Sequence, residues 1–311
     1  MALRVARKLA GLVATLLATS FIIFGAAYAA PGDPVTFLAG GKENLTPEYL
    51  AAVRAQYHLD DPFSVQYGRW LWDALNGDLG RSFQYNDQVL DLLAARLPTT
   101  LGLVAYAAVL FVVIGVALGV LAAVRGGRTD SMVVAGTTFA TSVPPFVAAT
   151  ALISVFGVQL GWFPVAGGGS FAHLTLPAIT LALGAVAIIS RVTRQAMVEQ
   201  RELDHVTVAR ASGLAERLIV VRHVFRGALG PVVTMCGLVS AGMLAGTVTV
   251  ETAFGLSGIG SLLVGAINTH DFPVTQAVLL LMVVAYITVT TLVELAQSLI
   301  DPRARIERSR A

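Results

Sequence analysis

The sequence is poor in charge, in lysine and in cysteine. Charged residues fill only 13% of its 311 positions, against roughly 25% in soluble domains. The single cysteine, Cys236, excludes a disulfide scaffold and a cysteine-rich metal site. The five histidines are scattered without metal-ligand spacing, so we expect no metal or other cofactor in this chain. The formal net charge of +2 gives no reason to expect a nucleic acid as partner.

Apolar residues are what the sequence has in excess. Hydrophobic residues make up 56% of the chain, and its mean hydropathy is +0.74. A helix needs about 20 apolar residues to cross a bilayer, and the uncharged runs 9–32, 97–124, 227–250 and 272–293 are each long enough. A fifth run, 131–190, holds two spans around a turn-rich break at 161–174. The sequence therefore predicts an all-α, polytopic membrane protein with six transmembrane helices.

The basic residues predict the orientation of these spans. Sixteen of the 21 lysines and arginines lie before the first span, after the second, between the fourth and fifth, or after the sixth. Because lysine and arginine favour the cytoplasmic side, both termini are expected there. The apolar segment 252–270 is broken by four glycines, and we expect it to be a re-entrant or surface segment. The first run is longer than a signal-peptide core, so we expect it to stay in the membrane.

This topology divides the chain into three parts. Residues 1–30 form the cytoplasmic end and first span, and residues 31–97 form a small helical external domain. Residues 98–311 form a five-helix core with a cytoplasmic loop at 191–226 and a basic cytoplasmic tail at 301–311.

The external part, 31–97, is predicted to form short helices. Helix starts are indicated by Thr46 and Asp61, each followed by proline, and Gly77 is a stop signal. Phe63, Tyr67 and Trp70 recur at helical spacing, and several aromatic residues suit a bilayer surface. We interpret the region mainly as a packed cap, with a docking surface for an external protein as the alternative.

The cytoplasmic stretch 191–226 predicts two short helices that meet at 211–214. Leu203, Val206 and Ala209 fall on one helical face, and Gly213 is placed to break the helix. An exposed amphipathic helix of this kind can insert into a groove of a partner protein. A solvated linker lying on the membrane is the other interpretation, and the pattern alone leaves both open.

Seven segments stand in a characteristic order along almost the whole chain. They are Pro31-Gly32-Asp33-Pro34-Val35, the stretch from Tyr57-His58-Leu59 to Arg81-Ser82, Arg96-Leu97-Pro98-Thr99-Thr100-Leu101, Gly161-Trp162-Phe163-Pro164-Val165, Leu176-Pro177-Ala178, the run 208–214 with Arg222-His223 and Pro231, and Val250-Glu251-Thr252-Ala253-Phe254 with Gly258-Ile259-Gly260. In these segments the chain resembles the first permease subunit of dipeptide and oligopeptide ABC importers.

The resemblance implies a type I ABC importer permease fold in a bacterial cytoplasmic (inner) membrane, and a set of partners. These are a second homologous permease subunit, two cytoplasmic ABC ATPase subunits, an external substrate-binding protein and the lipid bilayer, with a peptide as substrate. A phosphate-binding loop needs a lysine after glycine-rich backbone, and neither Lys8 nor Lys42 stands in that pattern. ATP and magnesium are therefore expected in the ATPase subunits, and this chain is not expected to be an enzyme.

The resemblance also places the contact with the ATPases in the 191–226 loop. Thr207, Val208 and Ala209 stand where the general importer motif has Glu-Ala-Ala, and Ser257 stands where we expect proline in the last external loop. Arginines of the loop are expected to pair with acidic groups of the ATPase or to hold the loop against lipid headgroups. The expected coupling residues are Thr207, Val208, Ala209, Arg210, Ala211, Ser212, Gly213, Leu214, Glu216, Arg217, Arg222 and His223.

Candidates for the translocation path or its gate are fewer. Ser142, Pro144 and Pro145 interrupt the third span, either as a packing kink or as a lining of the path. Glu251 and Phe254 lie at the outer end of the fifth span, where Glu251 either guards a gate or caps a loop. Glu294 is an acid inside the sixth span, and a structural ion pair with the arginine tail is our preferred role for it.

Three alternatives stay open at this point. The same class of importer also carries nickel complexes, haem or glutathione in some relatives. A six-span intramembrane serine protease would use Ser257 as nucleophile and His270 as base. A secondary transporter or channel would work without an ATPase, but the sequence shows no internal repeat.

Overall fold

The computed structural model describes residues 2–29, 60–167 and 170–300, together with positions 48, 51, 54 and 55. These residues are almost entirely helical, and their β structure is limited to one antiparallel bridge between Arg81 and Gln88. The helix start predicted at Thr46 and the basic tail 301–311 lie outside the described residues. Contacts divide the chain into two compact units, one of 1–98 with Ser257–Ile287 and one of Thr99–Leu256 with 288–311.

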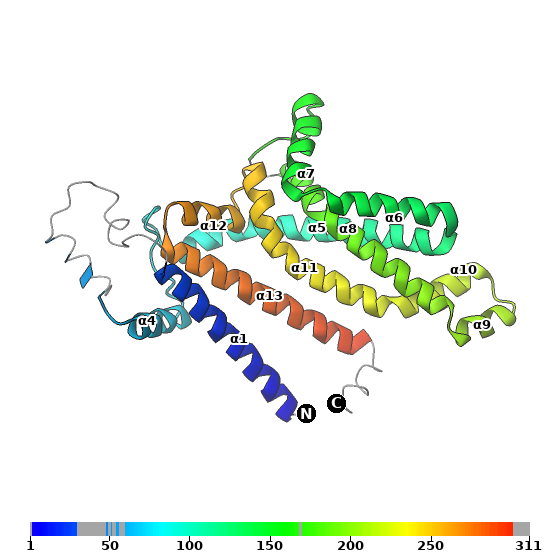
Figure 1. Ribbon diagram of the computed structural model, residues 1–311, viewed down its shortest axis with the longest axis horizontal. Coiled ribbons are helices and arrows are strands. Elements are labelled where there is room, and N and C mark those ends of the chain that lie inside the picture. Colours follow the sequence, from blue (N-terminus) through cyan, green and yellow to red (C-terminus); the bar gives the residue numbers. More distant parts are fainter. Residues whose placement is uncertain are drawn as a thin grey trace. The chain divides into compact units, whose positions relative to one another are not determined.

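Within the described residues, five helices are long and apolar enough to cross a membrane (Figure 1). They are α1 (Ala2–Tyr28), α5 (Val89–Arg125), α8 (Phe171–Arg201), the continuous helix Glu216–Phe254 that ends in α11 (Arg226–Phe254), and α13 (Phe272–Ile300).

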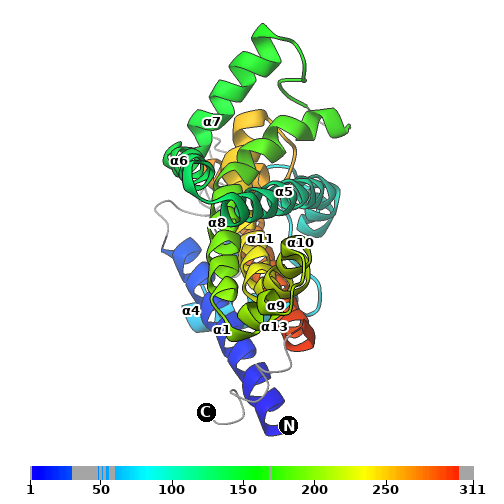
Figure 2. The same ribbon diagram turned by 90° about the vertical axis from the view of Figure 1, so that its right-hand side faces the viewer.

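A sixth span is bent. It consists of α6 (Gly127–Ser142), followed by α7 (Pro145–Leu152) and the π-helical segment η1 (Ile153–Gln159), and the two halves meet at 96°. Figures 1 and 2 both show α7 turning away from α6. With this pair counted as one span the total is six, as predicted. The bend lies between Ser142 and Pro145, where proline removes the backbone donors that a continuous helix needs.

The predicted breaks between spans are confirmed. The stretch 160–170 separates η1 from α8, as the glycine-rich break at 161–174 indicated. Gly255 adopts a left-handed conformation with φ of 61° and ends α11. The following helix α12 (Ile259–Asn268) has 10 residues, which is too short to span a bilayer.

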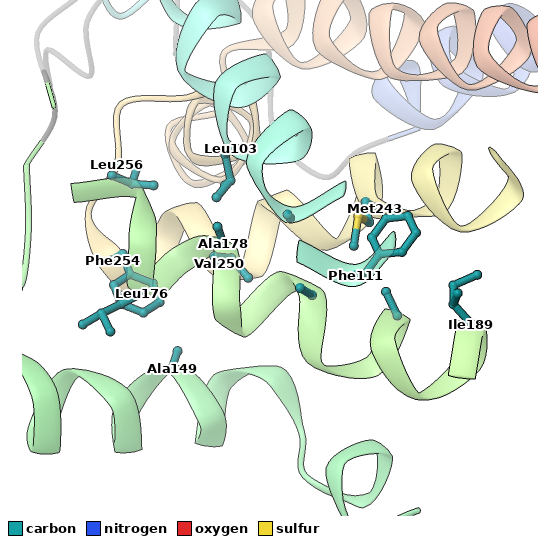
Figure 3. Close-up of a cluster of buried hydrophobic side chains, with 13 residues drawn as sticks. Leu103, Phe111, Ala149, Leu176, Ala178, Ile189, Met243, Val250, Phe254 and Leu256 are labelled. Carbon is teal, nitrogen blue, oxygen red and sulfur yellow. The ribbon is translucent and has the colours of Figure 1, made fainter. Parts of the chain in front are cut away.

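Helix α8 organises the second unit, packing against α6, α7 and α11. Its alanines let neighbouring backbones approach closely, and larger side chains from the other helices fill the space between them (Figure 3). Phe254 of α11 lies near Leu176 of α8 and Ala149 of α7. The fully buried members of this core include Leu103, Phe111, Ala149, Ala178 and Ile189.

Two glycines bring α5 against α8. A Cβ on Gly119 would lie 2.6 Å from the backbone oxygen of Ser190 and from Cβ of Thr193. A Cβ on Gly115 would lie 3.0 Å from Cβ of Ile189. The Gly115-xxx-Gly119 spacing is therefore a packing site within this subunit.

A second apolar cluster joins the ends of several helices in the same unit. It contains Ala123 of α5, Ala196 and Met197 of α8 and Ala228 of α11. The remaining members come from the short helices α9 (Asp204–Ala211) and α10 (Glu216–Ile219) and from the π-helical segment η2 (Val220–Phe225). This cluster holds the predicted cytoplasmic loop in a defined conformation.

In the first unit, α4 (Phe63–Leu75) packs on α1. It begins directly after Pro62 and ends before Gly77, whose φ is 86°. The start and stop signals at Asp61 and Gly77 are therefore confirmed.

A tight turn follows α4 in the same unit, closed by the Arg81–Gln88 bridge. Its Ser82 hydroxyl donates a hydrogen bond of 2.5 Å to the buried Asp271 carboxylate, which also accepts the backbone N–H of Gln84. Asp271 thereby joins this turn to the start of α13.

Candidate functional site

The predicted coupling loop forms a sharp corner. Helix α8 continues to Arg201, and α9 then runs to Ala211. The Leu214 N–H donates to the Ala209 carbonyl at 3.4 Å, and the Gly213 N–H donates to the Arg210 carbonyl at 3.1 Å. These two bonds form a Schellman motif, whose left-handed residue is Gly213 with φ of 77°. The prediction of two short helices meeting at 211–214 is confirmed.

Four buried apolar side chains fix the corner to the rest of its unit. Val206 and Ala209 come from α9, Ile219 from α10 and Val224 from η2. They pack with Met197 and its neighbours at the end of α8. In addition, the Arg201 guanidinium donates a hydrogen bond of 2.7 Å to the Ala123 carbonyl of α5. The corner therefore does not behave as a free linker.

The other side of the corner is exposed. Val208 is 63% exposed although it is apolar, and Leu214 and Leu218 are each a little under 40% exposed. The sequence pattern placed Leu203 with Val206 and Ala209 on one face, but Leu203 is 44% exposed. Among the predicted coupling residues, Ala209 is buried and His223 is half-buried. The other ten are exposed: Thr207, Val208, Arg210, Ala211, Ser212, Gly213, Leu214, Glu216, Arg217 and Arg222.

Charges surround this exposed apolar surface. The Arg210 guanidinium makes two hydrogen bonds of 3.2 and 3.3 Å to the Glu216 carboxylate, which link α9 to α10 across the corner. Arg217 and Arg222 are exposed on the same segment. The ring of His205 on α9 lies 6.3 Å from that of His223 on η2, measured between centroids. An apolar centre with a charged rim is typical of a protein-docking surface.

The corner also begins the longest continuous helix among the described residues. Helix α10, η2 and α11 follow one another without interruption over 39 residues, Glu216–Phe254. Figures 1 and 2 show α9 and α10 together where α8 ends and α11 begins. A protein that binds the corner is thus connected directly to a membrane span.

The candidate path residues do not gather in one place. Ser142, Pro144 and Pro145 are exposed at the bend between α6 and α7. Phe254 belongs to the buried core of α8 and α11. Glu294 is exposed near the end of α13, and the arginine tail proposed as its partner lies outside the described residues.

Glu251 is fully buried. Its carboxylate accepts a hydrogen bond of 2.6 Å from the Thr100 hydroxyl of α5. Within this chain Glu251 therefore joins α11 to α5.

Sequence reasoning missed an ion pair between α6 and α8. The Arg194 guanidinium makes two hydrogen bonds to the Asp130 carboxylate, and Arg191 donates to the Thr141 hydroxyl at 3.2 Å. Both contacts attach the first half of the bent span to α8. The available signal was Asp130 itself, an acid at the border of the long uncharged run.

The protease alternative fails on distance. Ser257 precedes α12 and His270 follows it, so the 10-residue helix stands between them. Such a helix is about 15 Å long, whereas a nucleophile and its base must be within hydrogen-bond reach.

Among the described residues no group of three or more metal-ligating side chains is found.

Two family profiles match the chain over nearly its whole length. A profile described as "Binding-protein-dependent transport system inner membrane component" matches residues 115–306. Its N-terminal companion, described as "Binding-prot-dependent transport system membrane comp, N-term", matches residues 1–104.

Curated relatives support the same grouping. A protein of Sinorhizobium fredii named as a probable peptide ABC transporter permease is 37% identical over 98% of this chain and 100% of its own length. A glutathione transport system permease of Escherichia coli is 35% identical over 97% of this chain and 98% of its own length.

Solved structures share the fold of the core. A chain of a methionine ABC transporter in an inward-facing conformation superposes with a TM-score of 0.58 at 20% identity, covering 68% of this chain and 97% of that one. A chain of an amino acid ABC transporter gives a TM-score of 0.54 at 16% identity, covering 67% of this chain and 94% of that one. The all-α, type I importer permease fold expected from the sequence is confirmed.

Proposed function

Because the chain belongs to the family of inner-membrane components of binding-protein-dependent transport systems, we propose that it is the permease subunit of an ABC importer for dipeptides or short oligopeptides. It is a multi-pass protein of the inner membrane. In this proposal it forms half of the translocation path, and a second homologous permease forms the other half. An external binding protein delivers the peptide, and both termini of this chain lie in the cytoplasm.

The observation that carries the peptide assignment is full-length similarity to two permeases whose names specify related substrates. One is named for peptides and the other for glutathione, which is itself a tripeptide. Both relatives match 97% or more of this chain, so the similarity includes the segment between the first two spans. Glutathione is therefore the first alternative substrate to test.

Two cytoplasmic ATPases supply the energy in this proposal, and they hold ATP and magnesium. The sequence of this chain supports that division, because neither Lys8 nor Lys42 follows the glycine-rich pattern of a phosphate-binding loop. Each ATPase needs a firm contact on its permease. The corner of α9 and α10 provides an exposed apolar surface fixed by a buried cluster.

Transport by the reconstituted complex tests the substrate. The chain is assembled in proteoliposomes with its second permease, its ATPases and its binding protein, and uptake of a radiolabelled dipeptide is measured with and without ATP. We expect ATP-dependent uptake that unlabelled dipeptides reduce. No uptake of the dipeptide, together with ATP-dependent uptake of labelled glutathione, haem or a nickel complex, would overturn the assignment to dipeptides and short oligopeptides. Uptake without the ATPases would overturn the importer.

A matched pair of variants tests the coupling surface. Val208→Glu places a charge on the exposed apolar surface, whereas Val208→Ile keeps it apolar. Because the Val208 side chain is exposed, both variants are expected to fold. We expect Val208→Glu to abolish ATP-driven uptake, and Val208→Ile to retain it. Equal uptake by the two variants would show that the ATPase contact lies elsewhere on the chain. The substrate assignment would not be affected.

A further inference from the structure

Helix α4 has three distinct faces. One face carries Phe63, Tyr67 and Trp70, which contact aromatic residues of α1. A second face carries Arg69 and Asp73, with Arg69 paired to Asp61 at 3.1 Å. The third is a stripe of apolar residues and glycine, named here the outer stripe, formed by Val65, Gly68, Trp72 and Leu75.

The outer stripe is exposed although it is apolar. Trp72 is 68% exposed and Leu75 is 75% exposed. At 3.6 residues per turn, the centre of the stripe lies about 150° around the helix from the face that packs on α1. A helix that lies on a protein surface in water needs only one apolar face. Helix α4 has two, and packing on α1 accounts for only one of them.

The contacts with α1 fix where α4 lies along that span. The apolar segment of α1 runs from Ala10 to Tyr28, and its length of about 28 Å matches the hydrocarbon core of a bilayer. Phe24, about 6 Å before the end of this segment, contacts Phe63, Tyr67 and Trp70.

One hydrogen bond lies deeper still. The Tyr67 hydroxyl lies 2.9 Å from that of Ser20, eight residues before Tyr28. Helix α4 therefore lies beside the last turns of the span, within the depth of the membrane.

From these positions we propose that the outer stripe is seated in the lipid of the leaflet at the Tyr28 end of α1. Helix α4 is then an interfacial membrane helix. Its aromatic face packs on α1, its charged face meets water, and its outer stripe contacts acyl chains near the headgroups. Interfacial helices are buried about 5–10 Å into this boundary, and tryptophan is enriched there. On α1 itself, Phe21 and Ile22 are apolar and exposed at the same depth as these contacts.

Spin-label accessibility tests the proposal on the full chain in lipid nanodiscs. Cys236→Ser removes the native thiol, and Val65→Cys, Trp72→Cys and Leu75→Cys each introduce one nitroxide. Asp73→Cys, on the charged face of the same helix, is the matched control. Molecular oxygen concentrates in lipid and a nickel chelate concentrates in water. We expect the ratio of oxygen to nickel accessibility to be severalfold higher at each stripe position than at position 73.

Two other results would overturn the proposal. High nickel accessibility at all four positions would place α4 in water as an external cap. Low accessibility to both reagents at the stripe would place it against protein, either the binding protein or the second permease.

A second measurement keeps the test valid if a cysteine variant does not fold. Trp70→Phe with Trp162→Phe leaves Trp72 as the only tryptophan of the chain. Its fluorescence should be quenched by phospholipids brominated near the headgroup more strongly than by those brominated near the chain end, and only weakly by aqueous iodide. Strong iodide quenching without lipid quenching would overturn the proposal.

Discussion

The Thr100 hydroxyl of α5 donates a hydrogen bond of 2.6 Å to the Glu251 carboxylate of α11, across 151 positions of sequence. Both residues are buried. A buried carboxylate is costly unless it is hydrogen-bonded, so this contact matters for how the two spans pack. Glu251, a candidate for the gate or for a loop cap from the sequence, is thus also a structural connection between two helices.

Replacing Thr100 with valine should therefore destabilise the protein. Thr100→Val keeps the shape but removes a donor from a buried carboxylate, which costs about 1–3 kcal/mol. Thr100→Ser keeps the hydroxyl and should cost less. The check is the midpoint of thermal unfolding in detergent for the two variants and the original chain. A midpoint for Thr100→Val at or above that of Thr100→Ser would show that the hydrogen bond contributes nothing.

The turn that holds Asp271 should loosen when Ser82 is replaced by alanine. The Ser82 hydroxyl donates to Asp271 and accepts the backbone N–H of Tyr85 at 2.9 Å. Losing two buried hydrogen bonds of about 1 kcal/mol each should speed amide exchange in residues 82–88 roughly tenfold or more. Hydrogen–deuterium exchange with mass spectrometry measures this. Gln84→Ala is the control, because Gln84 contributes only its backbone N–H; equal exchange in both variants would contradict the assignment.

Alanine at Gly119 should force α5 away from α8. Its Cβ would meet a backbone oxygen and a β-branched side chain at 2.6 Å, and overpacking of this kind costs about 1–3 kcal/mol. A Cβ on Gly242 meets nothing within 4 Å, so Gly242→Ala should not lower stability. The unfolding midpoints of the two variants decide the matter, and the same loss at both positions would refute close packing at Gly119.

The left-handed residue at the corner gives a prediction about backbone strain. A side chain at Gly213 has open space but must adopt a φ of 77°, which costs roughly 1–2 kcal/mol for most residues and less for asparagine. We expect Gly213→Ala to reduce ATP-driven uptake by reconstituted vesicles, and Gly213→Asn to reduce it less. If alanine and asparagine act alike, the surface of the corner and not its backbone conformation limits coupling.

Local signals predicted much of this fold. Uncharged runs located the spans, glycines marked their breaks, and Pro144 and Pro145 marked the bend between α6 and α7. Gly213 marked the corner because a left-handed helix end favours glycine whatever packs around it. Each of these features depends on a few residues that are neighbours in the sequence, so it can be predicted without knowing the fold.

The sequence did not predict which residues pair over long distances along the chain, and the reason is physical. Ser82 and Asp271 are 189 positions apart, and Asp130 and Arg194 are 64 apart. Only the folded chain brings such partners together. Burial was equally hard to predict, because a membrane helix is apolar on its lipid side as well as on its packed side. In α5, Phe111 and Val113 are both apolar, yet only Phe111 is buried.

The uninterrupted helix from Glu216 to Phe254 has a mechanical consequence. Its 39 residues extend for roughly 58 Å, nearly twice the thickness of the hydrocarbon core. Because the helix runs on from the corner into the span, a tilt applied at one end is carried toward the other, and the π-helical segment η2 and Pro231 are the points at which it can bend. A tilt of about 10° applied at the corner would shift the opposite end by roughly 10 Å relative to the corner. A change of angle at the corner would thus reach the other end of the helix as a displacement.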